Sequence, residues 1–125
     1  MANIELFAIF MTPTDRFQNP LGSPEGAKLL TEHLKYLFHL EDEQRLLASG
    51  PLDLNSDRIE GLCIVRAASR EEAETIAAEE PLAMAGWRIN TVRSWHLNEG
   101  VLIPAVRNVG SVGSAVADDQ HSRKS

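Results

Sequence analysis

A histidine occupies the apolar surface of the first predicted helix. When residues 24–47 are wound at about 100° per residue, six apolar or aromatic side chains fall within about 60° of His33: Leu29, Leu30, Tyr36, Leu37, Leu40 and Leu47. An imidazole can both accept and donate protons near neutral pH. His33 is therefore a candidate general acid or base. The alternative is a core histidine that hydrogen-bonds to a backbone carbonyl.

The second predicted helix carries one acid on its apolar face. That face has the spacing i, i+3, i+4, i+7 and comprises Ala73, Ile76, Ala77 and Glu80. We expect Glu80 at the C-terminal end of this helix, where the macrodipole disfavours a negative charge and a protonated imidazole would compensate it. Alternatively, Pro81 turns Glu80 outward and leaves it an ordinary surface acid. If both side chains face inward, His33 and Glu80 form a catalytic pair.

Three arginines are candidates for binding an anionic substrate. Arg66 ends a predicted strand, and Arg88 and Arg93 lie in the last one. A guanidinium recognises carboxylates and similar anions through several donors at once. The alternative for each is a solvated arginine or one at a subunit interface. Trp87 and Trp95 are expected to be anchors of the core or of such an interface.

The motifs of metal sites and phosphate loops are absent from the sequence. It contains no HxH, HExxH or CxxC spacing, so we predict no metal site. Gly110-Ser111-Val112-Gly113 lacks a following helix and is no phosphate-binding loop, and we expect no cofactor. Cys63 lies in the apolar run Gly61–Val65 and is expected to be a small core residue.

Charge and hydropathy restrict the partners. Eighteen acidic and twelve basic residues give a net charge of −6, which disfavours nucleic acid or an anionic membrane as the main partner. No apolar run approaches the roughly 18 residues of a membrane-spanning helix. The N-terminus also lacks the basic and apolar regions of a secretory leader. We therefore expect a cytoplasmic protein whose partner is a small-molecule substrate or ligand.

The first half of the chain predicts a strand, a loop and a helix. Ile4 to Met11 is a nearly continuous apolar run, typical of a strand covered on both faces. Thr12 to Gly22 is a long loop, which suggests that it borders a site. Ser23-Pro24-Glu25 has the residues of a helix start, and the helix is expected to run to about Leu47 and stop at Ser49-Gly50-Pro51.

The second half predicts a strand, a helix and a strand. Ile59 to Ala67 is a strong strand, preceded by a short one. Ser69 and Glu72 form a capping box that opens a helix from Arg70 to about Glu79, ended by Pro81. Residues 87–95 alternate, with one more apolar and one more polar face, as in a strand that is covered on one side.

This order of elements predicts an α+β fold of the ferredoxin-like βαββαβ type with a four-stranded antiparallel sheet. Two helices cover one face of such a sheet, yet the first strand is apolar on both faces. A second subunit packed sheet to sheet is the simplest cover, so we predict a homodimer. Residues 1–98 are expected to form the domain. Residues 99–125 are expected to form a tail that is partly disordered or packed on the dimer partner.

Five short motifs, in order and spacing over roughly residues 4–97, resemble the YCII-related (YciI-like) family. They are His33-Leu34-x-Tyr36-Leu37, Ser49-Gly50-Pro51-Leu52, Ala68-Ser69-x-Glu71-Glu72-Ala73, Glu80-Pro81-x4-Gly86 and Val92-x2-Trp95. The resemblance implies a dimeric α+β barrel and a pocket with a histidine–aspartate pair. His33 stands at the family's histidine. Glu80 stands where the family has aspartate, which keeps the charge on a side chain one methylene longer.

Two functions are compatible with these features. One recognised activity of the family is removal of chloride from a chlorinated hydroxyhydroquinone, and the fold neighbour muconolactone isomerase also moves protons. The resemblance thus implies a cofactor-independent lyase or isomerase, dehydrochlorinase-like, in which Glu80 orients His33 and an arginine steadies a developing anion. The alternative is a small-molecule-binding or regulatory dimer of the same family that uses the same pocket without turnover.

Overall fold

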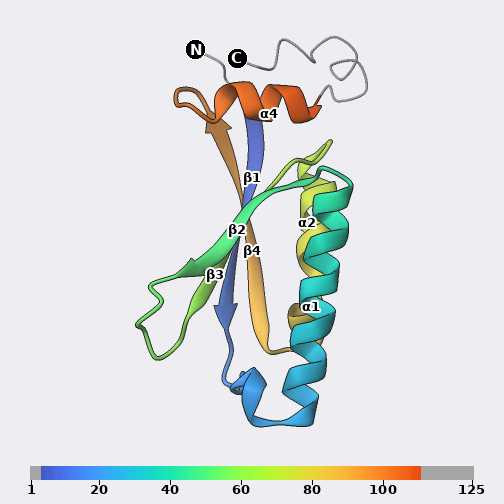
Figure 1. The fold of residues 1–125 in the computed structure, drawn as a ribbon, viewed down its shortest axis with the longest axis vertical. Coiled ribbons are helices and arrows are strands. Elements are labelled where there is room, and N and C mark those ends of the chain that lie inside the picture. Colours follow the sequence, from blue (N-terminus) through green and yellow to red (C-terminus); the bar gives the residue numbers. More distant parts are fainter. Residues whose placement is uncertain (1–3, 111–125) are drawn as a thin grey trace. The chain divides into compact units, whose positions relative to one another are not determined.

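The computed structural model describes residues 4–110 (Figure 1). Four strands form one antiparallel sheet in the order β2-β3-β1-β4. The elements along the chain are β1 (Ile4–Pro13), η1 (Pro20–Gly22), α1 (Pro24–Asp42), β2 (Leu46–Leu52), β3 (Glu60–Val65), α2 (Arg70–Ala78), α3 (Pro81–Met84), β4 (Arg88–Leu97) and α4 (Ile103–Gly110). The predicted ferredoxin-like α+β fold is confirmed.

Residues 5–95 form one compact unit, and Ile4 belongs with the described residues from His96 onward in another. Within the first unit, α1 and α2 lie on the same side of the sheet (Figure 1). In the part of the chain that the structure describes, no helix is both long and apolar enough to span a membrane.

The core lies between the sheet and these two helices. Along β1 every second residue, Phe7, Ile9 and Met11, points into it. Because side chains alternate along a strand, Leu6, Ala8 and Phe10 lie on the opposite face. The helices and the other strands complete the core with Leu37, Leu40, Ala73, Ile76, Ala77, Cys63, Val65 and Val92. The sheet therefore has one face covered by helices and one open face that also carries apolar side chains.

The first helix begins where the sequence predicts and ends earlier. Ser23 is the N-cap, and its hydroxyl accepts the Gly26 N–H at 3.0 Å. The helix stops at Asp42 rather than near Leu47, because Gln44 takes a left-handed conformation (φ 62°) and turns the chain into β2. Gly50 and Pro51, predicted as the helix stop, lie within β2, where an edge strand tolerates both.

The second helix has the predicted start. The Ser69 hydroxyl accepts the Glu72 N–H at 3.1 Å, and the Glu72 carboxylate accepts the Ala68 N–H at 2.6 Å. The helix ends at Ala78, two residues before the expected inward-facing acid. A separate short helix, α3, then begins at Pro81.

The chain beyond the last strand contains a helix that the sequence analysis did not predict. Strand β4 extends to Leu97, and α4 (Ile103–Gly110) lies within the segment predicted as a tail. Residues 111–125, which make up most of the predicted tail, lie outside the described residues. The domain boundary at residue 98 stays a prediction.

The first turn of α1 packs closely against the preceding loop at Gly26. A Cβ added there would lie 2.8 Å from Pro20 Cα and 2.9 Å from Pro20 O, both backbone atoms that cannot rotate away. Gly26→Ala is therefore expected to destabilise the protein by about 1–3 kcal/mol, despite the better helix propensity of alanine. Urea unfolding followed by circular dichroism measures the effect.

The matched control is Gly22→Ala, whose Cβ would meet only Asn19 Cβ at an ordinary 3.7 Å. This variant should unfold close to the wild-type midpoint. Equal stability of the two variants would contradict the close packing at Gly26.

Candidate active site

The two residues paired in the sequence analysis are in contact. His33 Nδ1 lies 2.8 Å from Glu80 Oε2, and the exposed fractions of the two residues are 8% and 1%. His33 comes from the stripe of α1 that also places Leu37 and Leu40 in the core. Glu80 comes from the segment between α2 and α3. The burial of Glu80 excludes the interpretation of this residue as a surface acid.

The local setting of Glu80 is the reverse of the one predicted. Because α2 ends at Ala78, Glu80 does not stand at a helix C-terminus. It is the N-cap of α3, with extended backbone (φ −68°, ψ 131°), and its Oε2 accepts the Leu82 N–H at 2.7 Å. The expectation of an unfavourable macrodipole was wrong, since Pro81 starts a new helix whose free N–H groups suit a carboxylate.

Asn90 on β4 completes the surroundings of the carboxylate. Its Nδ2 donates to Glu80 Oε1 at 3.0 Å and to the backbone oxygen of Ala77 at 2.9 Å. Burial alone would raise the pKa of Glu80, but the hydrogen bonds from His33, Asn90 and the Leu82 N–H outweigh it and hold that pKa below its usual value. Glu80 is therefore an ionised carboxylate at neutral pH.

An ionised carboxylate fixes the roles of the imidazole nitrogens. Glu80 Oε2 can only accept, so the shared proton sits on His33 Nδ1. Nε2 has no hydrogen-bond partner among residues 4–110. In the neutral ring this nitrogen carries the lone pair, which is the state that a general base requires.

His33 lines a pocket of about 220 Å³ that Glu80 does not reach. Its walls come from β1, α1, β2, β3 and the start of β4, and they are mostly apolar. They comprise Met11, His33, Leu34, Leu37, Ser49, Gly50, Pro51, Ile59, Glu60, Gly61, Leu62, Cys63 and Arg88. At Gly50, on the edge strand, an added Cβ would have no atom within 4 Å. The imidazole is thus placed between a buried carboxylate and a cavity of small-molecule size.

Arg88 is the one predicted arginine that lines this pocket. Its Nε is buried without a hydrogen-bond partner, Nη1 lies 3.5 Å from Met11 Sδ, and the guanidinium lies 5.9 Å from the centre of the Phe17 ring. Burial lowers the pKa of Arg88, and the charge of Glu80 acts in the opposite direction. Within residues 4–110 no carboxylate forms an ion pair with it. The cation is therefore available to an anion in the pocket.

The pocket leaves room for this guanidinium. A Cβ at Gly61 would lie 3.5 Å from Arg88 Nη1 and 3.4 Å from Met11 Sδ. Both distances are at the tight end of ordinary packing. The pocket wall at Gly61 therefore lies within ordinary packing distance of the arginine.

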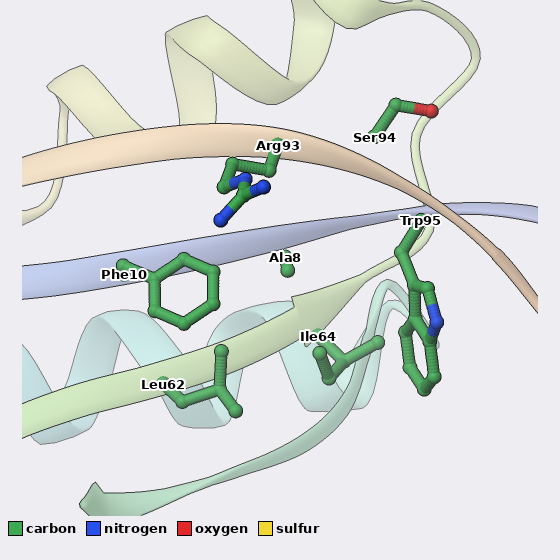
Figure 2. Close-up of a pocket in the computed structure, with 7 residues that line it drawn as sticks. All are labelled: Ala8, Phe10, Leu62, Ile64, Arg93, Ser94 and Trp95. Carbon is green, nitrogen blue, oxygen red and sulfur yellow. The ribbon is translucent and has the colours of Figure 1, made fainter.

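The other two candidate arginines lie elsewhere. Arg66 follows β3, and its backbone N–H donates to Arg45 O at 2.7 Å. Arg93 lies on the open face of the sheet, 6.0 Å from the centre of the Phe10 ring, beside a separate hollow (Figure 2). Substrate binding by either residue stays a prediction, since neither lines the pocket of His33.

Cys63 reaches the pocket wall but is poorly suited to act as a nucleophile. Burial, aided by the negative charge of Glu80, raises the pKa of this thiol to about 12. The thiolate is the reactive form, so the side chain is inert near neutral pH. Within residues 4–110 no group of three or more His, Cys, Asp or Glu side chains is placed to hold a metal ion.

The profile of the YCII-related domain matches residues 6–96. The chain belongs to the YCII-related family. A family relative is the uncharacterised protein YjpA of Bacillus subtilis (strain 168), which is 34% identical over 67 residues, or 54% of this chain and 75% of YjpA. The resemblance inferred from the five motifs is thereby confirmed.

A solved structure shows the same fold as this YCII-related protein. It is that of the 5-chloro-2-hydroxyhydroquinone dehydrochlorinase TftG from Burkholderia phenoliruptrix AC1100, in complex with 2,5-dihydroxybenzoquinone. Its TM-score is 0.55 at 23% identity, over 76% of this chain and 95% of TftG. A more distant likeness is to a mutant of SnoaB, a cofactor-independent oxygenase from Streptomyces nogalater. Its TM-score is 0.47 at 7% identity, over 78% of this chain and 96% of SnoaB.

Asn90 is the site residue that sequence reasoning missed in this YCII-related chain. The alternation of β4 assigned it to the more polar face, yet that face is the one turned toward the helices, because Val92 on it is buried in the core. The sequence did contain an indication of this, because Asn90 lies two residues from both Arg88 and Val92, and alternate residues of a strand share one face. A polar residue on the face of a core valine is expected to meet a buried partner.

The environment of Glu80 predicts how stability depends on pH. The pKa of Glu80 is lower in the folded protein than in the unfolded protein. The stabilisation that its charge contributes is therefore fully present above the unfolded-state pKa of about 4.3, and it is lost as the pH falls through the folded-state pKa. In Glu80→Gln, the NH₂ group of the new amide replaces one acceptor oxygen, so one of the N–H donors around it loses its acceptor. The free energy of unfolding is expected to fall by about 1–3 kcal/mol at pH 7. The difference from wild type should shrink below about pH 4. Urea unfolding at pH 7 and pH 3 measures both.

Glu79→Gln is the control, because it removes the neighbouring but exposed carboxylate. A cost of Glu80→Gln that is the same at both pH values would show that Glu80 is not held as a stabilised anion.

Proposed function

We propose that the protein is a cofactor-independent acid–base enzyme, a lyase or isomerase, acting on a small, ring-derived anionic substrate. The observation that carries the proposal is the buried 2.8 Å contact of His33 with Glu80, with the other imidazole nitrogen left without a partner on a residue that lines a cavity. That arrangement supplies a base held in one tautomer, and it requires neither a metal ion nor an organic cofactor.

His33 Nε2 takes a proton from a carbon or phenolic oxygen next to a carbonyl or its equivalent. The electron pair left behind moves onto oxygen, which forms an enolate or phenolate. In elimination, that pair returns and expels a leaving group such as chloride; in isomerisation, the imidazolium returns its proton to another carbon. Glu80 stabilises the imidazolium in between, since an ionised carboxylate 2.8 Å away favours the charged ring.

Arg88 is the group suited to the anionic oxygen. It lines the pocket with His33 and has an unpartnered buried Nε, so a bound oxyanion would satisfy a donor that the protein leaves unmet. A cation in a mostly apolar cavity stabilises developing charge more strongly than it would in water. Glu60 also lines the pocket, but it is exposed.

The cavity dimensions favour a compact substrate. A volume of about 220 Å³ is below the roughly 300–1,000 Å³ typical of pockets for drug-sized ligands. A single substituted ring is of the appropriate size. TftG, which has this fold, acts on 5-chloro-2-hydroxyhydroquinone and was solved with 2,5-dihydroxybenzoquinone. Single-ring hydroxylated compounds are therefore the first substrates to test.

The open face of the sheet is proposed to bind a second copy of the chain. It carries a hollow of about 300 Å³ lined by Ala8, Phe10, Leu62, Ile64, Arg93, Ser94 and Trp95 (Figure 2). Trp95 is 40% exposed and Ile89, on the same face of β4, is 62% exposed. Large apolar side chains grouped on one sheet face favour a partner of the same character, and a two-fold dimer pairs that face with itself.

Turnover of 5-chloro-2-hydroxyhydroquinone, followed as chloride release, tests the enzymatic proposal. His33→Ala is expected to lower kcat at least about 100-fold, the lower end of general-base effects. His33→Gln, which keeps an N–H donor for Glu80, should lose activity equally while preserving the fold. Arg88→Leu should mainly raise KM and weaken binding of 2,5-dihydroxybenzoquinone, because the anion loses its cation.

The control is His39→Ala, since His39 lies on the outer side of α1, where it pairs with Glu43 at 3.1 Å. It should match wild type. Tight binding of 2,5-dihydroxybenzoquinone without chloride release would favour the non-catalytic binding protein instead. Unchanged turnover in both His33 variants would refute the catalytic role of this residue.

Sedimentation equilibrium tests the homodimer. Wild type is expected at twice the mass of one chain, and Trp95→Glu at the mass of one chain, because a carboxylate would be buried in an apolar interface. Leu21→Glu, at an 84% exposed residue of η1, is the control and should remain dimeric. A monomeric wild type, or a Trp95→Glu variant that stays dimeric, would place the interface elsewhere or exclude it.

A further inference from the structure

The side-chain amide of Asn90 is held in a single orientation. Its Nδ2 donates to two acceptors, Ala77 O at 2.9 Å and Glu80 Oε1 at 3.0 Å. A backbone oxygen cannot donate, so rotating the amide by 180° would set its Oδ1 against Ala77 O and against a carboxylate oxygen. Both hydrogen bonds would be lost at once. The donor side of Asn90 must therefore face Glu80.

This orientation restricts where a proton can sit on Glu80. A proton on Oε1 would point at the N–H of Asn90 and bring two donors together. On the other side, Oε2 accepts the N–H of Leu82 at 2.7 Å and lies 2.8 Å from His33 Nδ1. Each carboxylate oxygen thus faces a fixed N–H donor, so the group is held as an acceptor and His33 Nδ1 is the donor of the contact between them.

From this geometry we propose that Asn90 is a positioning residue that keeps His33 in the tautomer with its proton on Nδ1 and its unprotonated Nε2 available to the pocket. Asn90 does not line the pocket and acts through Glu80. The catalytic consequence rests on the function proposed above. The tautomer does not, because it follows from the hydrogen bonds alone.

The other titratable groups around Glu80 do not donate a hydrogen bond that could take the place of the one from Asn90. From α1 come His33 itself and Tyr36, whose hydroxyl donates to Ile76 O at 2.9 Å and is thus engaged elsewhere. From β3 comes Cys63, a neutral thiol, and from β4 comes Arg88, which acts on Glu80 through charge. None of Tyr36, Cys63 and Arg88 forms a hydrogen bond to the carboxylate.

Packing alone does not explain an asparagine here. Its Oδ1 is buried and has no hydrogen-bond partner among the described residues. A leucine would fill a similar volume without leaving a polar atom unsatisfied. What the amide provides, and leucine would not, is the donor to Glu80.

The test uses protein labelled with ¹⁵N at histidine and long-range ¹H–¹⁵N spectra of the ring nitrogens at pH 8. His33→Gln assigns the His33 signals, and the exposed His39 gives an internal reference. In wild type, the spectrum should show His33 protonated at Nδ1 and unprotonated at Nε2. In Asn90→Leu, a fraction of the molecules should carry the proton at Nε2, because Glu80 Oε1 no longer faces a donor and only the Leu82 N–H still holds the group as an acceptor.

Asn90→Asp keeps the shape but replaces the donor with a second carboxylate. The two facing carboxylates then repel each other or share a proton, so Glu80 is no longer held as an acceptor on both sides and the single-tautomer His33 spectrum of wild type should be lost. Glu79→Gln, which removes an exposed carboxylate next to Glu80 in the sequence, is the control for a general change of charge near the site and should give the wild-type spectrum.

Enzyme kinetics add a separate readout. If the function proposed above holds, Asn90→Leu should lower kcat about tenfold or more with KM little changed, and should displace the acidic limb of the pH–rate profile. A wild-type ring protonated at Nε2, or identical His33 spectra in wild type and Asn90→Leu, would overturn the inference. The expected spectra without turnover in wild type would uphold the positioning role and reject the proposed enzyme.

Discussion

The carboxylate of Glu80 is the point at which separate parts of the chain meet. It receives an N–H from α1 through His33, one from β4 through Asn90 and one from the backbone of α3 at Leu82. Removing an ion of this size from water costs several kcal/mol unless donors replace its hydration. Three charge-assisted hydrogen bonds do so here. The relative placement of helix, sheet and short helix is thereby tied to one charge.

This constraint explains why the chain breaks its helix where it does. If α2 continued through residue 80, the carboxylate would face the negative end of the helix and have no backbone N–H to accept. Ending at Ala78 and restarting at Pro81 gives Glu80 an extended backbone and makes it an N-cap. The same break leaves Ala77 O exposed to Asn90. The local chain geometry and the electrostatics of the site therefore depend on each other.

Sequence periodicity was sufficient for the fold class and for the faces of both long helices. It also assigned His33 to an inward position, which follows from spacing along one helix. It assigned Glu80 to an inward position as well, although the helix assumed for that residue ends at Ala78. It did not locate the C-terminal end of α1 or the helix α4, which depend on contacts between elements. Leu46 and Leu47 continued the apolar pattern of α1 yet lie in β2, which pairs with β3, since strand pairing there outweighs helix propensity. Asn90 was missed for a related reason: which face of β4 meets the helices is decided by the sheet.

The residues that line the pocket fall into two groups, those that carry the reactive side chains and those of the edge strand. The group suited to proton transfer lies on α1, in a hydrogen-bond network with Glu80 and Asn90, and the group suited to binding an anion lies at the start of β4. Another part of the wall, Ser49-Gly50-Pro51, lies on the edge strand, and a Cβ at Gly50 would meet no atom within 4 Å. Substitutions on that wall can narrow, lengthen or polarise the cavity without disturbing the ionised pair. A fold arranged in this way can change its substrate during evolution through one exposed strand while its reactive groups stay in place.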